Sequence, residues 1–170
     1  MAVGDAGYPS PDNFLTSALF RRWVAAGALV AFLDGLFAIV LFSTILKLGT
    51  PVQVFQGVAK ALIGQSAFQG GLATAALGLC LHCCVAFSWA GAYAIALRIS
   101  PGLRQFVSTH AGVLVVGALL GAIVWLAMDL VILPFTHAVP RPAIGSTIFI
   151  SELIGHMIIV GPPIARIIHV

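Results

Sequence analysis

The chain has 170 residues, of which 61% are hydrophobic and 8% are charged, and its formal net charge is +3 at pH 7. Soluble domains carry about 25% charged residues, so this composition cannot form a water-facing surface and excludes a soluble protein. The apolar runs are continuous and do not alternate with polar residues, which predicts an all-α integral membrane protein and not a barrel. Because the basic residues stand singly at the ends of these runs, the expected surroundings are the lipid bilayer, and nucleic acid is not an expected partner.

Residues 1–20 are expected to form a polar N-terminal tail, and residues 21–170 a single transmembrane bundle. A spanning helix needs about 20 apolar residues, and four runs meet that length. The sequence therefore predicts a four-transmembrane-helix bundle, with spans at about 23–47, 72–97, 111–135 and 143–165.

Residues 51–64, between the first two runs, are predicted to form an interfacial helix, because they are too short and too polar to span. Thr50 followed by Pro51 is typical of a helix start. We expect a polar face that points to water and an apolar face that points inward: the first holds Gln53, Gln56 and Lys60, and the second Phe55, Ala59 and Leu62.

Five ionisable residues lie inside the apolar runs, namely Asp34, His82, Asp129, Glu152 and His156, which we call the polar seam. An ionisable side chain in hydrocarbon costs a few kcal/mol or more, so each should face protein or water and have a partner. Glu152 and His156 are four residues apart and share one face of a helix. We therefore expect the polar seam to point into the bundle.

Depth along the spans predicts which members of the polar seam meet. At ~1.5 Å per residue, His82 and Glu152 lie at one level, and Asp34 and His156 at another. Two acid–imidazole pairs are expected. They would either fix the register of the helices or form a proton path, an ion path or a polar ligand site.

His82 and His156 are also the two residues that could clamp a haem from opposite helices. Their estimated depths differ by ~5 Å, which disfavours such ligation. We expect neither a metal site nor an enzyme, because no nucleophile stands beside a base and the cysteines lack a second pair of ligands. Small residues at Ala31/Gly35 and Gly117/Gly121 are typical of close helix packing.

An Asp in spans one and three and a His in spans two and four suggest a parallel internal repeat, with chance similarity as the rival explanation.

Several patches carry a family resemblance: Pro51-x4-Gln56-x2-Ala59, Gly78-x3-His82, Asp129-Leu-Val-x-Leu-Pro134 and His156-x4-Gly161-x-Pro163. They resemble a group of short uncharacterised bacterial four-span inner-membrane proteins, distantly similar to the YagU-like membrane proteins. The resemblance implies a bacterial inner-membrane location and no particular activity.

Basic residues predict that both termini are cytoplasmic, with Arg21, Arg22, Arg98, Arg104 and Arg166 on the inside. The first functional expectation is a non-catalytic protein that acts through helix packing, as an accessory subunit of a larger membrane complex or as a homo-oligomer. The alternatives are a small proton- or ion-coupled transporter that uses the polar seam, and a haem-binding electron carrier. A contiguous inward-facing seam beside a cavity would favour transport, and scattered, satisfied pairs in a dry core would favour packing.

Overall fold

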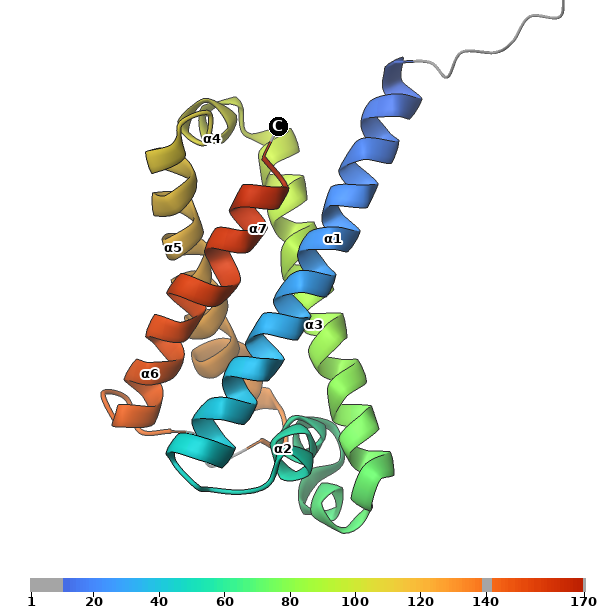
Figure 1. The fold of residues 1–170 in the computed structure, drawn as a ribbon, viewed down its shortest axis with the longest axis vertical. Helices are drawn as coiled ribbons and strands as arrows, with labels where there is room; N and C mark the ends of the chain where they lie inside the picture. The colour runs from blue at the N-terminus through green and yellow to red at the C-terminus, as the bar shows by residue number, and fades with distance from the viewer. Residues whose placement is uncertain (1–10, 139–141, 170) are drawn as a thin grey trace, which may run out of the picture.

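A computed structural model describes residues 11–138 and 142–169, all of whose regular elements are helical (Figure 1). The first span is α1 (Pro11–Ile39) with a π-helical continuation (Val40–Ile45), and the second is α3 (Gly71–Ile99). The third joins α5 (His110–Ala127) to π-helical Met128–Ile132 and 3-10 helical Leu133–Phe135. The fourth joins α6 (Thr147–Gly155), π-helical His156–Val160 and α7 (Gly161–Ile167). The shorter connections hold α2 (Pro51–Ile63) with 3-10 helical Gly64–Gln69, and α4 (Pro101–Phe106).

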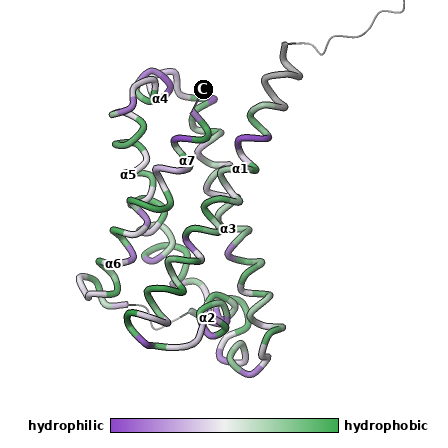
Figure 2. Tube along the Cα trace, in the orientation of Figure 1, coloured by the Kyte–Doolittle hydropathy of each residue, from purple (hydrophilic) through white to green (hydrophobic). Residues whose placement is uncertain are grey.

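Four of these helical stretches are long and apolar enough to cross a membrane: Ala18–Ile45, Gly71–Ile99, His110–Phe135 and Thr147–Ile167. Hydrophobic positions dominate each of them (Figure 2). The predicted fold class is confirmed: the chain is an all-helical, four-span membrane protein with a shorter helix between spans one and two.

Two boundaries differ from those that composition predicts. Helix α1 begins at Pro11, within the stretch expected to be a tail, and residues 1–10 lie outside the described residues. The fourth span begins at Thr147 and not at 143, because the Ser146 hydroxyl caps the helix by accepting a hydrogen bond from the Phe149 N–H at 3.2 Å. Gly145, at φ +81°, makes the turn before it. The apolar residues Ala143 and Ile144, which were expected to begin the span, therefore belong to the loop before it.

The spans form two pairs, α1 with α3 and α5 with α6–α7, and α1 packing against α7 joins the pairs (Figure 1). The second pair meets backbone to backbone. A Cβ added to Gly121 would lie 2.0 Å from the His156 carbonyl oxygen, and one added to Gly161 would lie 1.8 Å from that of Gly117. The glycine pair that predicts close packing therefore holds the fourth span against α5.

The bundle is packed at one end and hollow at the other. The main cluster of buried side chains includes Val30, Leu97, Val113, Ile164 and Ile168. It occupies the end where α4 and the C-terminus lie (Figure 1). Helix α2 lies at the opposite end, between the ends of the spans.

Helix α2 begins as predicted, with a capping box in which Thr50 and Gln53 bond to each other's backbone N–H. It then crosses α3 at Gly78, where an added Cβ would lie 1.8 Å from the Phe55 carbonyl oxygen. Gly78 is ~10 Å along the axis of α3 from its first residue, Gly71. The helix therefore packs against the wall of the bundle.

The predicted polar face of α2 is wrong at one position, because Gln56 is only 3% exposed. The Gln56 side-chain amide donates to the Gly71 carbonyl at 3.0 Å and to Thr74 Oγ1 at 3.3 Å, so α3 offers it the acceptors that water was expected to supply. Ala59 is fully buried, as predicted.

The contact at Gly78 gives a first prediction. Gly78→Ala should push α2 off α3 and lower the free energy of unfolding by about 1–3 kcal/mol, as overpacking generally does. The matched control is Gly57→Ala in α2, because nothing lies within 4 Å of the Cβ it would add. That change should be neutral or stabilise the helix by up to about 1 kcal/mol. Thermal unfolding in detergent, followed by circular dichroism, compares the two, and equal midpoints would contradict this packing.

Candidate functional site

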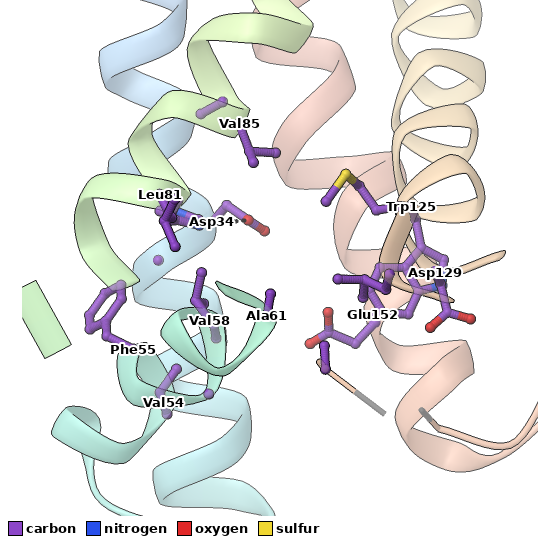
Figure 3. A pocket seen from close by; sticks show the side chains of 18 of the residues that line it. Asp34, Val54, Phe55, Val58, Ala61, Leu81, Val85, Trp125, Asp129 and Glu152 are labelled. Carbon is purple, nitrogen blue, oxygen red and sulfur yellow. Dashed lines mark ion pairs between the residues drawn. The ribbon is translucent and has the colours of Figure 1, made fainter. Parts of the chain in front are cut away.

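A cavity of about 760 Å³ lies within the bundle, between the α1–α3 pair and the α5–α6 pair, and α2 forms part of its wall (Figure 3). The structure brings all five members of the polar seam to this one cavity, whose lining includes Asp34, His82, Asp129, Glu152 and His156. The seam is therefore contiguous and points inward. Most of the remaining wall is apolar, with Val54, Phe55, Val58, Leu81 and Val85 among the side chains that surround the space in Figure 3.

The cavity is open toward one end of the bundle. Its lining residues near α2 include the exposed Leu48 and Leu62. At the opposite end its lining residues are Val30, Val160 and Ile164, which are buried in the core. The accessible part of the cavity therefore lies near α2, and packed aliphatic side chains close its opposite end.

Asp34 stands between two imidazoles that come from different spans. Its Oδ2 is 3.9 Å from His82 Nδ1, and its Oδ1 is 3.8 Å from His156 Nε2. These distances exceed that of a direct hydrogen bond and are within ion-pair reach when an imidazole carries a proton. The three side chains are less than one-fifth exposed, so they form a largely buried carboxyl–imidazole cluster.

A single turn of α1 holds His82 in place. The Nε2–H of His82 donates to the Ala31 carbonyl at 2.9 Å, and Asp34 follows in the same turn. Gly35 leaves room for the ring, since an added Cβ would lie 3.4 Å from His82 Nε2. The small pair Ala31/Gly35 therefore accommodates an imidazole and not only a helix.

His156 is held from its own helix. Its Nδ1–H donates to the Glu152 carbonyl at 2.8 Å, and its ring packs on that of Trp125 with centroids 5.1 Å apart. The residue opens the π-helical segment His156–Val160. Pro162 and Pro163 follow and lack the N–H groups that an α-helix would donate to the carbonyls of the preceding turn, which permits this wider turn.

These hydrogen bonds assign the tautomers. A backbone carbonyl only accepts, so a neutral His82 carries its proton on Nε2 and a neutral His156 carries its proton on Nδ1. The ring nitrogen that each imidazole turns toward Asp34 then carries no proton. It can only accept a hydrogen bond, and it faces a carboxylate oxygen that can also only accept. The arrangement becomes favourable when a proton or a water joins either nitrogen to Asp34.

Asp129 and Glu152 occupy the opposite wall and are 1% and 8% exposed (Figure 3). Among the described residues, Glu152 Oε1 is a buried oxygen that no hydrogen bond satisfies. Glu152 also interacts electrostatically with Asp34 and Asp129. Glu152 therefore interacts with both of the other carboxyl groups that line the cavity.

The pairing expected from depth holds for Asp34 and His156 and is wrong for His82, which meets Asp34 and not Glu152. The observed span ends explain the difference. Counted from them at ~1.5 Å per residue, Asp34 and His82 both lie ~16 Å deep, whereas Glu152 lies ~8 Å deep because its span starts at Thr147. Asp129, ~9 Å deep, is the residue at the level of Glu152.

A haem clamped by His82 and His156 does not fit this geometry. Each ring donates one nitrogen to a backbone carbonyl and turns the other toward Asp34, which lies where the iron would have to bind. Among the described residues, no group of three or more His, Cys, Asp or Glu side chains could hold a metal ion.

Sequence reasoning missed two features of the site. One is Trp125, which lines the cavity and contacts both His156 and Phe149. The other is the presence of π-helical segments, of which Met128–Ile132 contains Asp129 and His156–Val160 begins at a member of the polar seam. Such segments are frequent at functional sites, and the prolines that follow them, Pro134 and Pro162-Pro163, are sequence signals that could have indicated them.

No family model, curated protein or solved structure matches this chain. The resemblance to bacterial four-span proteins therefore stays a prediction.

The observed pairing predicts how mutations combine. Asp34→Leu and His82→Leu should each destabilise the protein, and the double variant should lose less than the sum of the two, with a coupling of about 0.5–3 kcal/mol. His82→Leu and Glu152→Leu should show a smaller coupling, because these two side chains interact with the same Asp34 and not directly with each other. Unfolding of the purified variants in detergent measures both cycles. A larger coupling in the second cycle would restore the pairing expected from depth.

The tautomers can be observed directly. In protein labelled with ¹⁵N-histidine, solid-state NMR in lipid at alkaline pH should show protonated Nε2 for His82 and protonated Nδ1 for His156. His82→Gln and His156→Gln assign the two sets of signals. Finding the same tautomer for both residues would contradict the two backbone hydrogen bonds.

Proposed function

We propose that this protein is a small proton-coupled membrane carrier, in which the polar seam binds the proton and the cavity binds the solute. The observation that carries the proposal is Asp34, held between His82 and His156 on the wall of a cavity open at one end. This is the arrangement that the alternative expectation from sequence, a proton- or ion-coupled transporter, requires.

Helix packing alone explains the site less well. A purely structural lock would leave its polar groups satisfied by one another within a dry core, because a partly satisfied buried network is costly. Here a buried Glu152 oxygen has no hydrogen bond among the described residues, and the space beside it could hold a solute. The glycine contacts at Gly117, Gly121 and Gly161 join helices of this chain to each other. An accessory role, a membrane-protein partner and a homo-oligomer stay predictions.

The cluster suggests how a proton is held. A proton added to either imidazole creates a cation whose two N–H groups face a backbone carbonyl and the Asp34 carboxylate. Asp34 can also receive that proton and pass it to the other ring through a water, since both rings face it at similar distances. A charged solute entering the same cavity changes the field at this cluster and couples its own binding to that of the proton.

Transport also needs the closed end to open. The side chains of Val160 and Ile164 close the cavity and flank Pro162-Pro163, which follow the π-helical segment. Broken helices of this kind supply the moving parts and binding sites of many carriers. We propose that the fourth span bends at this point and that the cavity then opens toward the other side.

We further propose a bacterial inner-membrane location with both termini cytoplasmic. The two ends of the described chain lie at the same end of the bundle, as four spans require (Figure 1). The arginine-rich end of the protein is this end, which the positive-inside rule assigns to the cytoplasm. The cavity would then open to the outside.

Proton movement in vesicles tests the carrier function. Pyranine-loaded proteoliposomes should change internal pH when a solute from a panel of amino acids, monocarboxylates, sugars and quaternary ammonium ions is added outside. Asp34→Asn should reduce the initial rate at least ~10-fold, because it removes the carboxylate between the imidazoles. Cys84→Ser, an exposed position outside the cavity lining, is the control that should retain the rate. The proposal is rejected if no solute of the panel changes the internal pH, or if the Asp34→Asn variant changes it as fast as the wild type.

A further inference from the structure

We infer that the cavity binds a lipophilic cation, an organic ion that carries its positive charge on an apolar or aromatic body, and exchanges it for a proton. The inference rests on the proposed carrier function and adds the class of its solute. It combines three observations: the charge of the wall, an unsatisfied buried oxygen and an aromatic, apolar lining.

The charge of the cavity favours a cation. Three carboxyl groups line it, from Asp34, Asp129 and Glu152, against two imidazoles, and its described lining residues include no Lys or Arg. The lining therefore holds more groups that can be negative than groups that can be positive. An anionic solute would meet repulsion from every carboxyl in a medium of low dielectric constant.

Glu152 marks the place where the positive charge of the ligand would bind. The residue is more than nine-tenths buried, its side chain lines the cavity, and its Oε1 has no hydrogen-bond partner among the described residues. A buried acceptor of this kind destabilises the empty protein and gains most from a ligand that brings a positive charge or an N–H group. Asp129, on the third span and at the depth of Glu152, interacts with it electrostatically.

The rest of the wall selects the body of the ligand. Trp125, Trp89 and Phe55 line the cavity and offer aromatic rings, which attract cations and pack against apolar groups. The other lining side chains are mostly aliphatic, so a small hydrated ion would find few ligands there. A cavity of about 760 Å³ is within the range that holds drug-sized molecules.

Exchange for a proton follows from the position of Asp34. A cation beside Glu152 repels a proton held at the Asp34 cluster, because the two carboxyl groups already interact electrostatically. The proton then leaves through the open end as the cation binds, and it returns when the cation departs. No bond other than that to the transferred proton is made or broken.

A pair of ions that match in size and differ in charge tests the inference on the wild-type protein. Tetraphenylphosphonium and tetraphenylborate are titrated against the protein in lipid nanodiscs, with empty nanodiscs as the background and tryptophan fluorescence as the signal, since Trp89 and Trp125 line the cavity. We expect saturable binding of the cation at least ~10-fold tighter than that of the anion. Binding of the cation should weaken from pH 8 to pH 5, because in an exchange the proton competes with the cation for the cavity. Equal affinities, a preference for the anion or no saturable binding would overturn the inference.

Two variants locate the site. Glu152→Gln keeps the size of the side chain and should lower the affinity for tetraphenylphosphonium at least ~10-fold. Asp12→Asn makes the same change of charge in the first turn of α1, ~33 Å along the helix from Asp34, and should leave the affinity unchanged. Equal loss in both variants, or wild-type affinity in Glu152→Gln, would overturn the inference.

The vesicle assay separates this inference from the proposed function. If tetraphenylphosphonium binds through Glu152 but no solute moves protons, the carrier function is rejected and the binding site stands. If another solute moves protons through Asp34 and tetraphenylphosphonium does not bind, the carrier stands and the lipophilic cation is rejected.

Discussion

The structure depends on keeping a carboxyl group, Asp34, partnered at a depth where lipid offers no hydrogen bonds. One turn of α1 supplies what is needed: the Ala31 carbonyl that orients His82, the Asp34 carboxyl that faces the ring, and the space left by Gly35. One turn of the fourth span likewise orients an imidazole, because the Glu152 carbonyl accepts a hydrogen bond from His156. Gly155 in that turn has no side chain where the Phe37 ring of α1 packs, since an added Cβ would lie 2.4 Å from it. Small residues therefore position the polar groups as much as they pack the helices.

Composition and run length were sufficient to predict the four spans, because the length needed to cross hydrocarbon is fixed and a helix is the form in which a single chain satisfies its backbone there. The inward direction of the polar seam was predictable for the same reason. The partner of His82 was not. Depth counting needs the first residue of a span, and the Ser146 cap moves the fourth span by four residues, enough to separate Glu152 from His82 and bring it level with Asp129.

The faces of α2 show a second limit of sequence reasoning. Its periodicity separates polar from apolar residues correctly, but the direction of the polar face followed from the assumption that only water satisfies an amide. Gln56 finds its acceptors on Gly71 and Thr74 of the neighbouring span instead. No pattern within residues 51–64 contains that information, since it lies in the contact at Gly78 that brings α2 against α3. The ring of Trp125 against His156 is hidden from sequence for the same reason.

The two halves of the chain differ at the site even though each holds an Asp in one span and a His in the next. A faithful repeat would pair Asp129 with His156 as Asp34 pairs with His82, yet His156 turns its free nitrogen to Asp34. Both imidazoles thus serve one carboxyl, and the second half keeps two carboxyls, Asp129 and Glu152, side by side on the cavity wall. In the exchange mechanism that we propose, this asymmetry gives a proton and a cation separate places within one cavity. Because the places are close enough to interact electrostatically, occupation of one opposes occupation of the other, which is the requirement for exchange across a membrane.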